Sequence, residues 1–411
     1  MTAAIIVVRL SYVRRVGRRG ARVFWYLVIL AAVVVVGVLA HGVLAVHGRE
    51  FEPGPLFICL LFFAFMALRA SSVGADTYTY EEVLVWVSKY DFSQLAGLDS
   101  DTWYLSGSDV GYRYYAKTVS LLSDAPRAMT VANSAVTCAA LYVFIRRSSA
   151  DLWLSCFLFF TLGFFQLSMN LAPSFMGLLV VACGYGHMVA GRFWRFVPYV
   201  LLGAVFHPAM LFMVPVYFIV RIKLSQRRFF TLLAVASVVA LFFYPAVLFV
   251  LRHVVPARYI SYFSSEVITL EKMLVWVSHL AIFGICWYMQ KNREDMFRDN
   301  GVACWLFLLE SVVYLLSSQS TGLGRVAYVL SPYLIVTIPA LLQTVRGAEL
   351  PLPKRTGQVD TGRQLPEGWE RHVPALSATK TSIVILCVLV YIARLFVNNI
   401  GTTMPYLFFW M

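Results

Sequence analysis

A polar cluster stands directly after an apolar run that ends at Leu68. Within a dozen residues it carries Arg69, Asp76, Tyr78 and Tyr80. The planar guanidinium of an arginine suits a phosphate or diphosphate, and a carboxylate can hydrogen-bond a sugar hydroxyl or take its proton. The structural alternative is an arginine that reaches lipid headgroups and an aspartate that caps the helix after it. In both interpretations the cluster marks the mouth of a helical bundle.

A second cluster, from Asp109 to Tyr115, combines an aspartate with three tyrosines and Arg113. Tyrosine rings suit the flat faces of sugars, and the carboxylate of Asp109 suits their hydroxyls. The alternative is a helix that begins with an aspartate and carries the aromatic residues common at membrane interfaces. Both clusters therefore indicate either carbohydrate recognition or a membrane boundary.

Four further polar residues lie in or beside apolar segments: Asn170, His207, Glu310 and Arg325. His207 precedes a proline and is either a satisfied structural residue or a group that titrates near neutrality. Arg325 follows a Ser- and Gly-rich stretch, where it would clamp a phosphate or contact a headgroup. A carboxylate at membrane depth is costly, so Glu310 would face a cavity or a partner as an ion-pair anchor, a proton relay or a neutral acid. Asn170 is a weaker polar signal at a helix end.

The composition indicates a membrane protein. Of the 411 residues, 60% are hydrophobic and 13% are charged, whereas about a quarter are charged in soluble domains. Apolar runs of about 17–25 residues fit spanning helices rather than barrel strands. The net charge of +13 comes mainly from short clusters between these runs, which is typical of membrane topology and anionic headgroups. Without a basic stripe bearing interleaved aromatics, nucleic acid is not an expected partner.

We therefore predict an all-α, polytopic transmembrane bundle of about 11–12 spans, with one long outer loop at 69–127 that carries short helices. The apolar segments lie at 23–46, 55–68, 128–145, 152–169, 172–190, 196–220, 229–251, 272–290, 301–317, 326–345 and 381–397. The predicted regions are a basic arm (1–22), the bundle (23–345), a flexible cytoplasmic linker (346–380), and a final span with an outer tail (381–411).

The segment 196–220 decides the topology, because its prolines make it either one kinked span or a hairpin of two short helices. With a hairpin, the later basic clusters are cytoplasmic and the 69–127 loop is outside. Six arginines of the N-terminal arm then lie outside, contrary to the positive-inside rule. With a single span, those six are cytoplasmic, but Arg146, Arg147, Arg192 and Arg195 lie outside.

No motif for a metal or cofactor appears. The seven cysteines lie in apolar runs and form no CxxC pair. This pattern is typical of small, buried apolar residues. A Walker loop, HExxH, GxSxG and paired DxD are absent as well. We expect neither metal nor cofactor.

Several short motifs resemble, in family order, those of the EpsG-like, Wzy-type bacterial polysaccharide polymerases. The residues that carry the resemblance are Arg69 with Gly74-Ala75-Asp76-Thr77-Tyr78 and Tyr80, Asp109-Val110-Gly111-Tyr112, Phe206-His207-Pro208-Ala209, Gly324-Arg325-Val326-Ala327-Tyr328 and Pro405-Tyr406-Leu407-Phe408-Phe409. There are departures. Ala75 replaces the family's threonine, Asp109 replaces a glutamate, and an arginine expected after the fourth span is missing from 169–174.

The resemblance implies an inner-membrane enzyme that joins undecaprenyl-diphosphate-linked oligosaccharide repeat units on the outer face. The implied catalytic residues are Arg69 and Arg325 on the diphosphate, with Asp76 or Asp109 orienting or deprotonating the acceptor hydroxyl. The implied substrate-binding residues are Tyr78, Tyr80, Tyr112, Arg113, Asn170, His207 and Glu310. Membrane lipid, a chain-length regulator and a flippase are the further expected partners.

Three rival functions remain open at this point. A flippase or other transporter would place its ionisable residues deep in the spans. A glycosyltransferase that uses polyprenyl-phosphate sugars would carry an acidic pair in its first outer loop, and Glu81-Glu82 is such a pair. A non-enzymatic assembly partner would use the first cluster as a boundary only.

Overall fold

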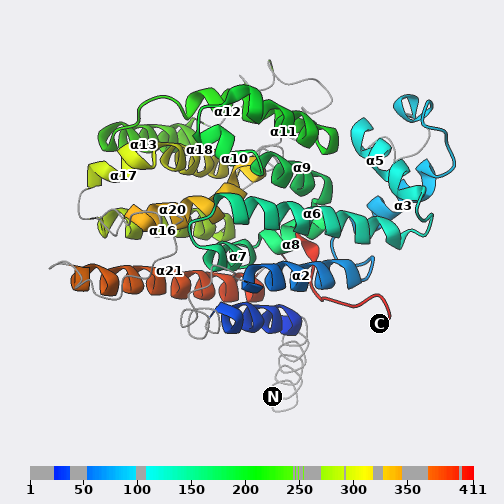
Figure 1. Cartoon of the computed structure of the whole chain (residues 1–411), viewed down its shortest axis with the longest axis horizontal. Helices are drawn as coiled ribbons and strands as arrows, with labels where there is room; N and C mark the ends of the chain where they lie inside the picture. Colours follow the sequence, from blue (N-terminus) through cyan, green and yellow to red (C-terminus); the bar gives the residue numbers. More distant parts are fainter. Residues whose placement is uncertain are drawn as a thin grey trace, which may run out of the picture. The chain divides into compact units, whose positions relative to one another are not determined.

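The computed structural model of the chain is all-helical in its described part (Figure 1). It describes residues 23–37, 53–98, 108–243, 270–290, 293–317, 327–344, 369–397 and 400–411, and the single positions 246, 249 and 253. The basic arm 1–22, Arg325 and most of the predicted linker lie outside these ranges. The chain divides into two compact units, the first of residues 1–217 and 390–411 and the second of residues 218–389.

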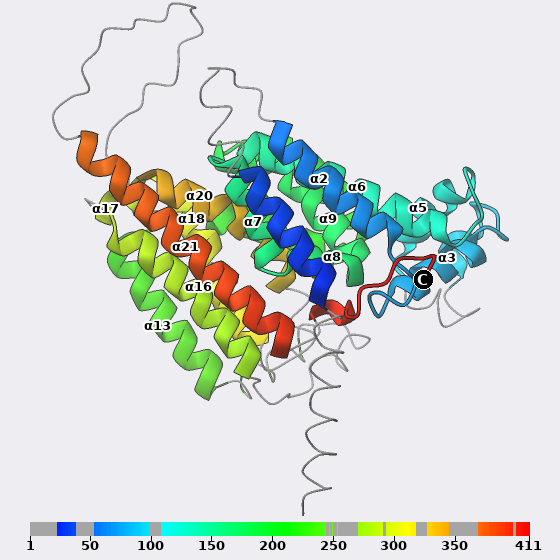
Figure 2. The same ribbon diagram turned by 90° about the horizontal axis from the view of Figure 1, so that it is seen from below.

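The first unit is built around the longest helix of its bundle, α6, which packs against α2 and α9, while α9 packs against α11 (Figure 2). Gly177 of α9 and Gly203 of α11 bring these backbones together, since a Cβ on Gly177 would lie 2.6 Å from the Gly203 carbonyl oxygen. The helices of the unit are Val23–Gly37, α2 (Pro53–Leu68), α6 (Arg127–Ser148), α7 (Leu152–Thr161), α8 (Phe164–Asn170), α9 (Ala172–Ala182), α10 (Tyr185–Val189) and α11 (Phe193–Phe206).

The helices are those of a polytopic membrane bundle. Among the described residues, Arg127–Ser148 and Ala378–Phe396 are long and apolar enough to cross a membrane unbroken. The predicted span 152–169 is instead two helices, α7 and α8, bent by 60°. Gly163 makes the break with a φ of +88°, and Arg394 donates from Nη1 to the Leu162 carbonyl at 2.9 Å. Eight shorter apolar helices of 10–17 residues accompany them.

The segment 196–220 forms the hairpin alternative. Helix α11 ends at Phe206, and the chain continues through η3 (Pro208–Phe212) and α12 (Met213–Ile219). The Tyr217 ring lies 5.1 Å from Phe193 and 5.7 Å from Phe196, centroid to centroid. The end of the second helix therefore returns to the start of the first.

The loop 69–127 carries short helices as predicted: α3 (Thr77–Val87), η2 (Leu95–Gly97) and α5 (Val110–Ser120). They share an apolar core in which Leu84, Leu95, Tyr112 and Met129 are buried. The described parts of the loop, residues 69–98 and 108–127, therefore form a packed cap on α6 and α11.

The second unit is a separate bundle in which α18 packs against α13, α16 and α20. Phe283 stacks between Phe229 and Phe307, at centroid distances of 4.6 and 4.5 Å. Its helices are α13 (Gln226–Phe242), α16 (Leu270–Tyr288), α17 (Arg293–Asp299), α18 (Gly301–Ser317), η5 (Ser331–Tyr333) and α20 (Leu334–Thr344).

The predicted boundary of the cytoplasmic linker needs correction. Helix α21 (Trp369–Val397) begins 12 residues before the predicted final span at 381, so residues 369–380 are helical. The apolar part that could cross a membrane begins at Ala378.

Candidate functional site

Asp109 and His207 form a partly exposed pair. The Asp109 Oδ2 and His207 Nδ1 atoms lie 2.7 Å apart, and their side chains are 30% and 21% exposed. Asp109 immediately precedes α5 and His207 immediately follows α11, both in extended conformation. Since a proline disfavours helical backbone in the residue before it, Pro208 ends α11 at this point. Two motifs 98 residues apart thus meet at two helix ends.

Gly111 permits this meeting. A Cβ on Gly111 would lie 2.1 Å from the carbonyl oxygen of Val205, so α5 and α11 touch where α5 has no side chain. Arg113 holds the preceding loop, donating from Nε to the Ser108 hydroxyl at 3.1 Å and from Nη2 to the Ser108 carbonyl at 3.0 Å. Arg113 is buried, so it positions Asp109 rather than facing the exposed side of the pair.

The pair has the geometry of a carboxylate-oriented histidine. A carboxylate on Nδ1 favours the tautomer with hydrogen on that nitrogen and leaves Nε2 as the acceptor. It also stabilises the imidazolium that forms when Nε2 takes a proton. The tautomer follows here from the contact with Asp109. The pair can therefore act as a general base toward a hydroxyl placed at Nε2.

Asn170 accepts hydrogen bonds from two residues of the first predicted cluster. Its side-chain oxygen accepts from the Asp76 backbone N–H at 3.2 Å, and its carbonyl accepts from the Tyr80 hydroxyl at 2.9 Å. The Asp76 side chain makes no capping bond to α3 and is half-buried. Gly74, with a φ of +92°, lets the intervening turn pass close to the Met169 carbonyl. The structure thus brings Asp76, Tyr80 and Asn170 together.

Arg69 lies beneath this turn, with only 1% of its surface exposed. Its guanidinium donates to the Met66 and Met169 carbonyls and to the hydroxyls of Thr77 and Ser134. Burial lowers the pKa of this guanidinium to about 10, so it stays charged at neutral pH. The described partners of Arg69 are therefore protein groups from α2, α3, α6 and α8.

The tyrosines differ in accessibility. The Tyr80 and Tyr112 rings meet edge to face at 5.7 Å, which connects the first cluster to α5. Tyr112 is buried, its hydroxyl accepts from Asn133 Nδ2 at 2.9 Å, and burial raises its pKa. Tyr78 is 52% exposed. Among these rings, Tyr78 is exposed and Tyr80 is half-buried, so these two are accessible from outside.

Two further charged residues lie in this region: Glu81, which the sequence offered only as half of an acidic pair for a rival function, and Arg127, which was not selected. Glu81 is buried and accepts from the hydroxyls of Ser71 and Thr130. Arg127, at the first residue of α6, donates to the Arg69 carbonyl at 3.2 Å. The signal for Arg127 was its position: like Arg325, it stands at a predicted outer helix start, where positive-inside bias does not explain it.

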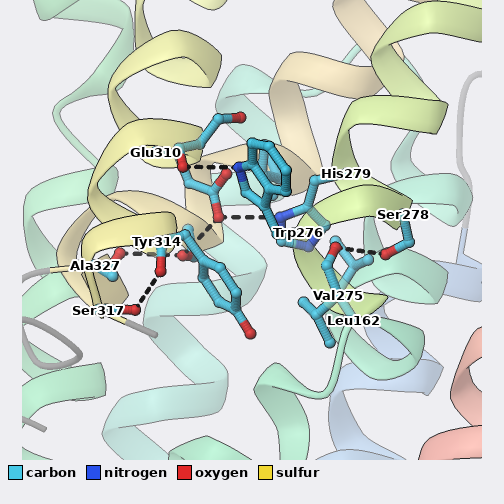
Figure 3. A network of polar contacts seen from close by, with 12 residues as sticks. Leu162, Val275, Trp276, Ser278, His279, Glu310, Tyr314, Ser317 and Ala327 are labelled. Atoms are coloured by element: carbon cyan, nitrogen blue, oxygen red, sulfur yellow. Dashed lines mark hydrogen bonds and ion pairs between the residues drawn. The ribbon is translucent and has the colours of Figure 1, made fainter. Parts of the chain in front are cut away.

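Glu310 belongs to the second unit and is fully buried (Figure 3). Its Oε1 accepts from the Ser331 hydroxyl at 2.9 Å and lies 3.1 Å from Nδ1 of buried His279. A lone charge would be costly there, and His279 and Ser331 are the polar groups that lie against this carboxylate. This arrangement gives Glu310 a partner and joins α16, α18 and η5.

Within the described residues, no group of three or more His, Cys, Asp or Glu could hold a metal ion. The seven cysteines are unpaired, and all but Cys183 are buried.

The model of the EpsG family matches residues 55–349. This match covers well over half of the chain and includes both clusters, the His207 hairpin, Glu310 and Arg325. The chain belongs to the EpsG family. With its apolar helices, this EpsG-family chain is a membrane protein of the polysaccharide-polymerase type. No curated protein and no solved structure gives a significant match. The aromatic C-terminal end lies beyond the matched residues.

Replacing Gly111 by alanine should separate α5 from α11. The new Cβ would meet a backbone carbonyl, and overpacking of this kind costs roughly 1–3 kcal/mol. We expect the purified protein to melt several degrees lower. Gly97→Ala is the matched control in the same loop, since its Cβ would meet nothing within 4 Å. Equal melting temperatures for the two variants would contradict the close contact.

Replacing Glu310 by alanine should strongly destabilise the second unit. The change leaves buried His279 without its carboxylate, whereas Ser331 keeps its hydrogen bond to the Ala327 carbonyl. Breaking a buried pair costs about 3–5 kcal/mol. Thermal unfolding of the purified protein measures the loss. The double variant Glu310→Ala/His279→Ala should recover part of it, because no partner is then left unpaired. Strictly additive losses would show that the two side chains are not coupled.

Proposed function

We propose that this EpsG-family protein polymerises oligosaccharide repeat units carried on undecaprenyl diphosphate, at the outer face of the bacterial inner membrane. The single observation that carries the proposal is the Asp109–His207 pair. It joins two family motifs, is open to solvent and lies beside an exposed tyrosine-bearing cap. A flippase needs no such base, whereas glycosyl transfer to a hydroxyl does.

The proposed reaction assigns a role to each group. The acceptor is a sugar hydroxyl, and His207 Nε2 takes its proton while Asp109 stabilises the imidazolium. The hydroxyl oxygen forms a bond to the anomeric carbon of the donor sugar. The bond from that carbon to the diphosphate oxygen breaks, and the lipid diphosphate leaves with the electron pair. Charge on this leaving group needs a fixed cation, and Arg325 is the sequence candidate.

The other predicted residues take different parts. Tyr78 and Tyr80 would bind sugar, and half-buried Asp76 would hydrogen-bond it. Tyr112 and Arg113 are buried beside Asp109 and would act by positioning α5. Arg69 would hold the turn that carries Asp76, and Asn170 would support Tyr80. A flippase would supply the repeat units, and a chain-length regulator would limit the product.

Replacing either member of the pair should abolish polymerisation. Asp109→Asn and His207→Gln, expressed in a strain lacking the gene, should cut polymer formation by about 10²-fold or more. Electrophoresis of the surface glycan would then show single repeat units on the acceptor. Asp124→Asn, at an exposed aspartate of the same loop, should give normal chains. Normal chains from both pair variants would refute the base, and absent units would indicate a flippase or an earlier transferase.

The 69–127 cap should face outward. Helix α6 runs from this cap to Arg146 and Arg147, a basic pair expected to be cytoplasmic. The hairpin at 193–219 agrees with the topology in which that holds. A cysteine at exposed Ala75 should react with a membrane-impermeant thiol reagent in intact spheroplasts. A cysteine at exposed Arg147 should react only after permeabilisation, and the reverse pattern would overturn the proposed side of the reaction.

A further inference from the structure

Arg127 is a fixed guanidinium at the start of spanning helix α6. Its Nη2 donates to the Ala67 carbonyl and its Nη1 to the Arg69 carbonyl at 3.2 Å. Its guanidinium carbon lies 3.6 Å from the centroid of the Phe409 ring. These two hydrogen bonds use two of the five N–H donors that an arginine carries. The side chain is half-buried, so it is held in place while part of it stays accessible.

Arg127 and Arg69 interact electrostatically with the same described carboxylate. Glu81 is the carboxylate that acts electrostatically on both Arg69 and Arg127. Its oxygens already accept hydrogen bonds from Ser71 and Thr130. Among the described residues, both guanidinium groups therefore interact with Glu81, and Arg127 is the more accessible of the two. Its accessible positive charge suits an anionic group.

The surface beside Arg127 is apolar and exposed. The exposed C-terminal side chains are Leu407 (37%), Phe409 (50%), Trp410 (59%) and Met411 (71%), while Phe408 between them is half-buried. Their backbone is fixed, because Phe409 N–H donates to the Leu68 carbonyl at 3.0 Å. A cation bordered by such side chains at a helix start suits an amphiphile with an anionic head and a hydrocarbon chain.

This surface lies away from the Asp109–His207 pair. Asp109 stands before the first residue of α5, and Arg127 follows the other end of that helix. Its 11 residues span about 16 Å. In Figure 1, α5 lies above the line of α6 and the C-terminal segment lies below it.

We propose that Arg127, Phe409 and Trp410 form the headgroup site of the polyprenyl diphosphate that carries the acceptor oligosaccharide. This rests on the proposed function, in which the acceptor is itself lipid-linked. Its reacting hydroxyl belongs to a sugar distant from its lipid. The diphosphate can thus lie on Arg127 while the hydroxyl reaches His207.

Binding of undecaprenyl diphosphate to the purified protein tests the site. Arg127→Ala should weaken binding by roughly ten-fold or more, as expected for loss of a charged hydrogen bond. Binding of undecaprenol, which lacks the diphosphate, should not change. Arg146→Ala is the matched control, because Arg146 is an exposed arginine beside the Tyr142 ring at the other end of α6. It should bind undecaprenyl diphosphate like the wild type.

Wild-type affinity in Arg127→Ala would overturn the proposal. Displacement of undecaprenyl diphosphate by an equal concentration of phosphatidylglycerol would also overturn it, since the surface would then be a general anionic-lipid contact. If Arg127→Ala does not fold, Phe409→Ala leaves the guanidinium in place and should still weaken undecaprenyl diphosphate binding several-fold. Unchanged affinity in that variant would refute the site.

A second measurement separates this site from the catalytic pair. Asp109→Asn should bind undecaprenyl diphosphate like the wild type while making no polymer. Arg127→Ala should raise KM for the lipid-linked acceptor more than it lowers kcat. If Asp109→Asn still made polymer while Arg127→Ala bound the lipid weakly, the catalytic role of the Asp109–His207 pair would be refuted. The lipid site would then still stand. A loss confined to kcat in Arg127→Ala would refute the acceptor assignment.

Discussion

The buried guanidinium of Arg69 is the interaction on which the organisation of the cap depends. A charge taken out of water is costly unless its donors are satisfied, and Arg69 meets this condition with groups from α2, α3, α6 and α8. Each of these bonds also fixes one element relative to the others. The turn that carries Asp76, and the helix end that carries Asn170, therefore have defined places.

Close backbone contact provides the second constraint. Membrane helices associate through small residues because no hydrophobic driving force acts between them in lipid. Gly177 and Gly203 bring α9 against α11, and Gly111 brings α5 against the end of α11. The last contact makes the Asp109–His207 pair, since neither residue lies within a helix that could otherwise aim it. Packing at a glycine thus determines which polar groups meet.

The bundle and the helices of the 69–127 loop were predictable from apolar runs and residue type. The functions of individual side chains were harder to assign. Arg69, Tyr112 and Arg113 have the chemistry of substrate-binding residues, yet all three are buried among protein partners. Composition cannot distinguish a guanidinium that faces a cavity from one that binds carbonyls, because the carbonyls belong to distant segments. Arg127 is the opposite case, because it was not selected from the sequence and yet is partly accessible. Its partners, the Ala67 and Arg69 carbonyls and the Phe409 ring, also belong to other segments.

The sequence by itself determined that the chain is a helical membrane protein and which polar residues stand at helix ends, because hydropathy and proline position are local properties. It also contained the EpsG motifs in order. Only the tertiary structure decided that Asp109 meets His207 across 98 residues, that 193–219 is a hairpin, and that Glu310 pairs with His279. These are long-range contacts, and they depend on how helices pack rather than on the composition of any one helix.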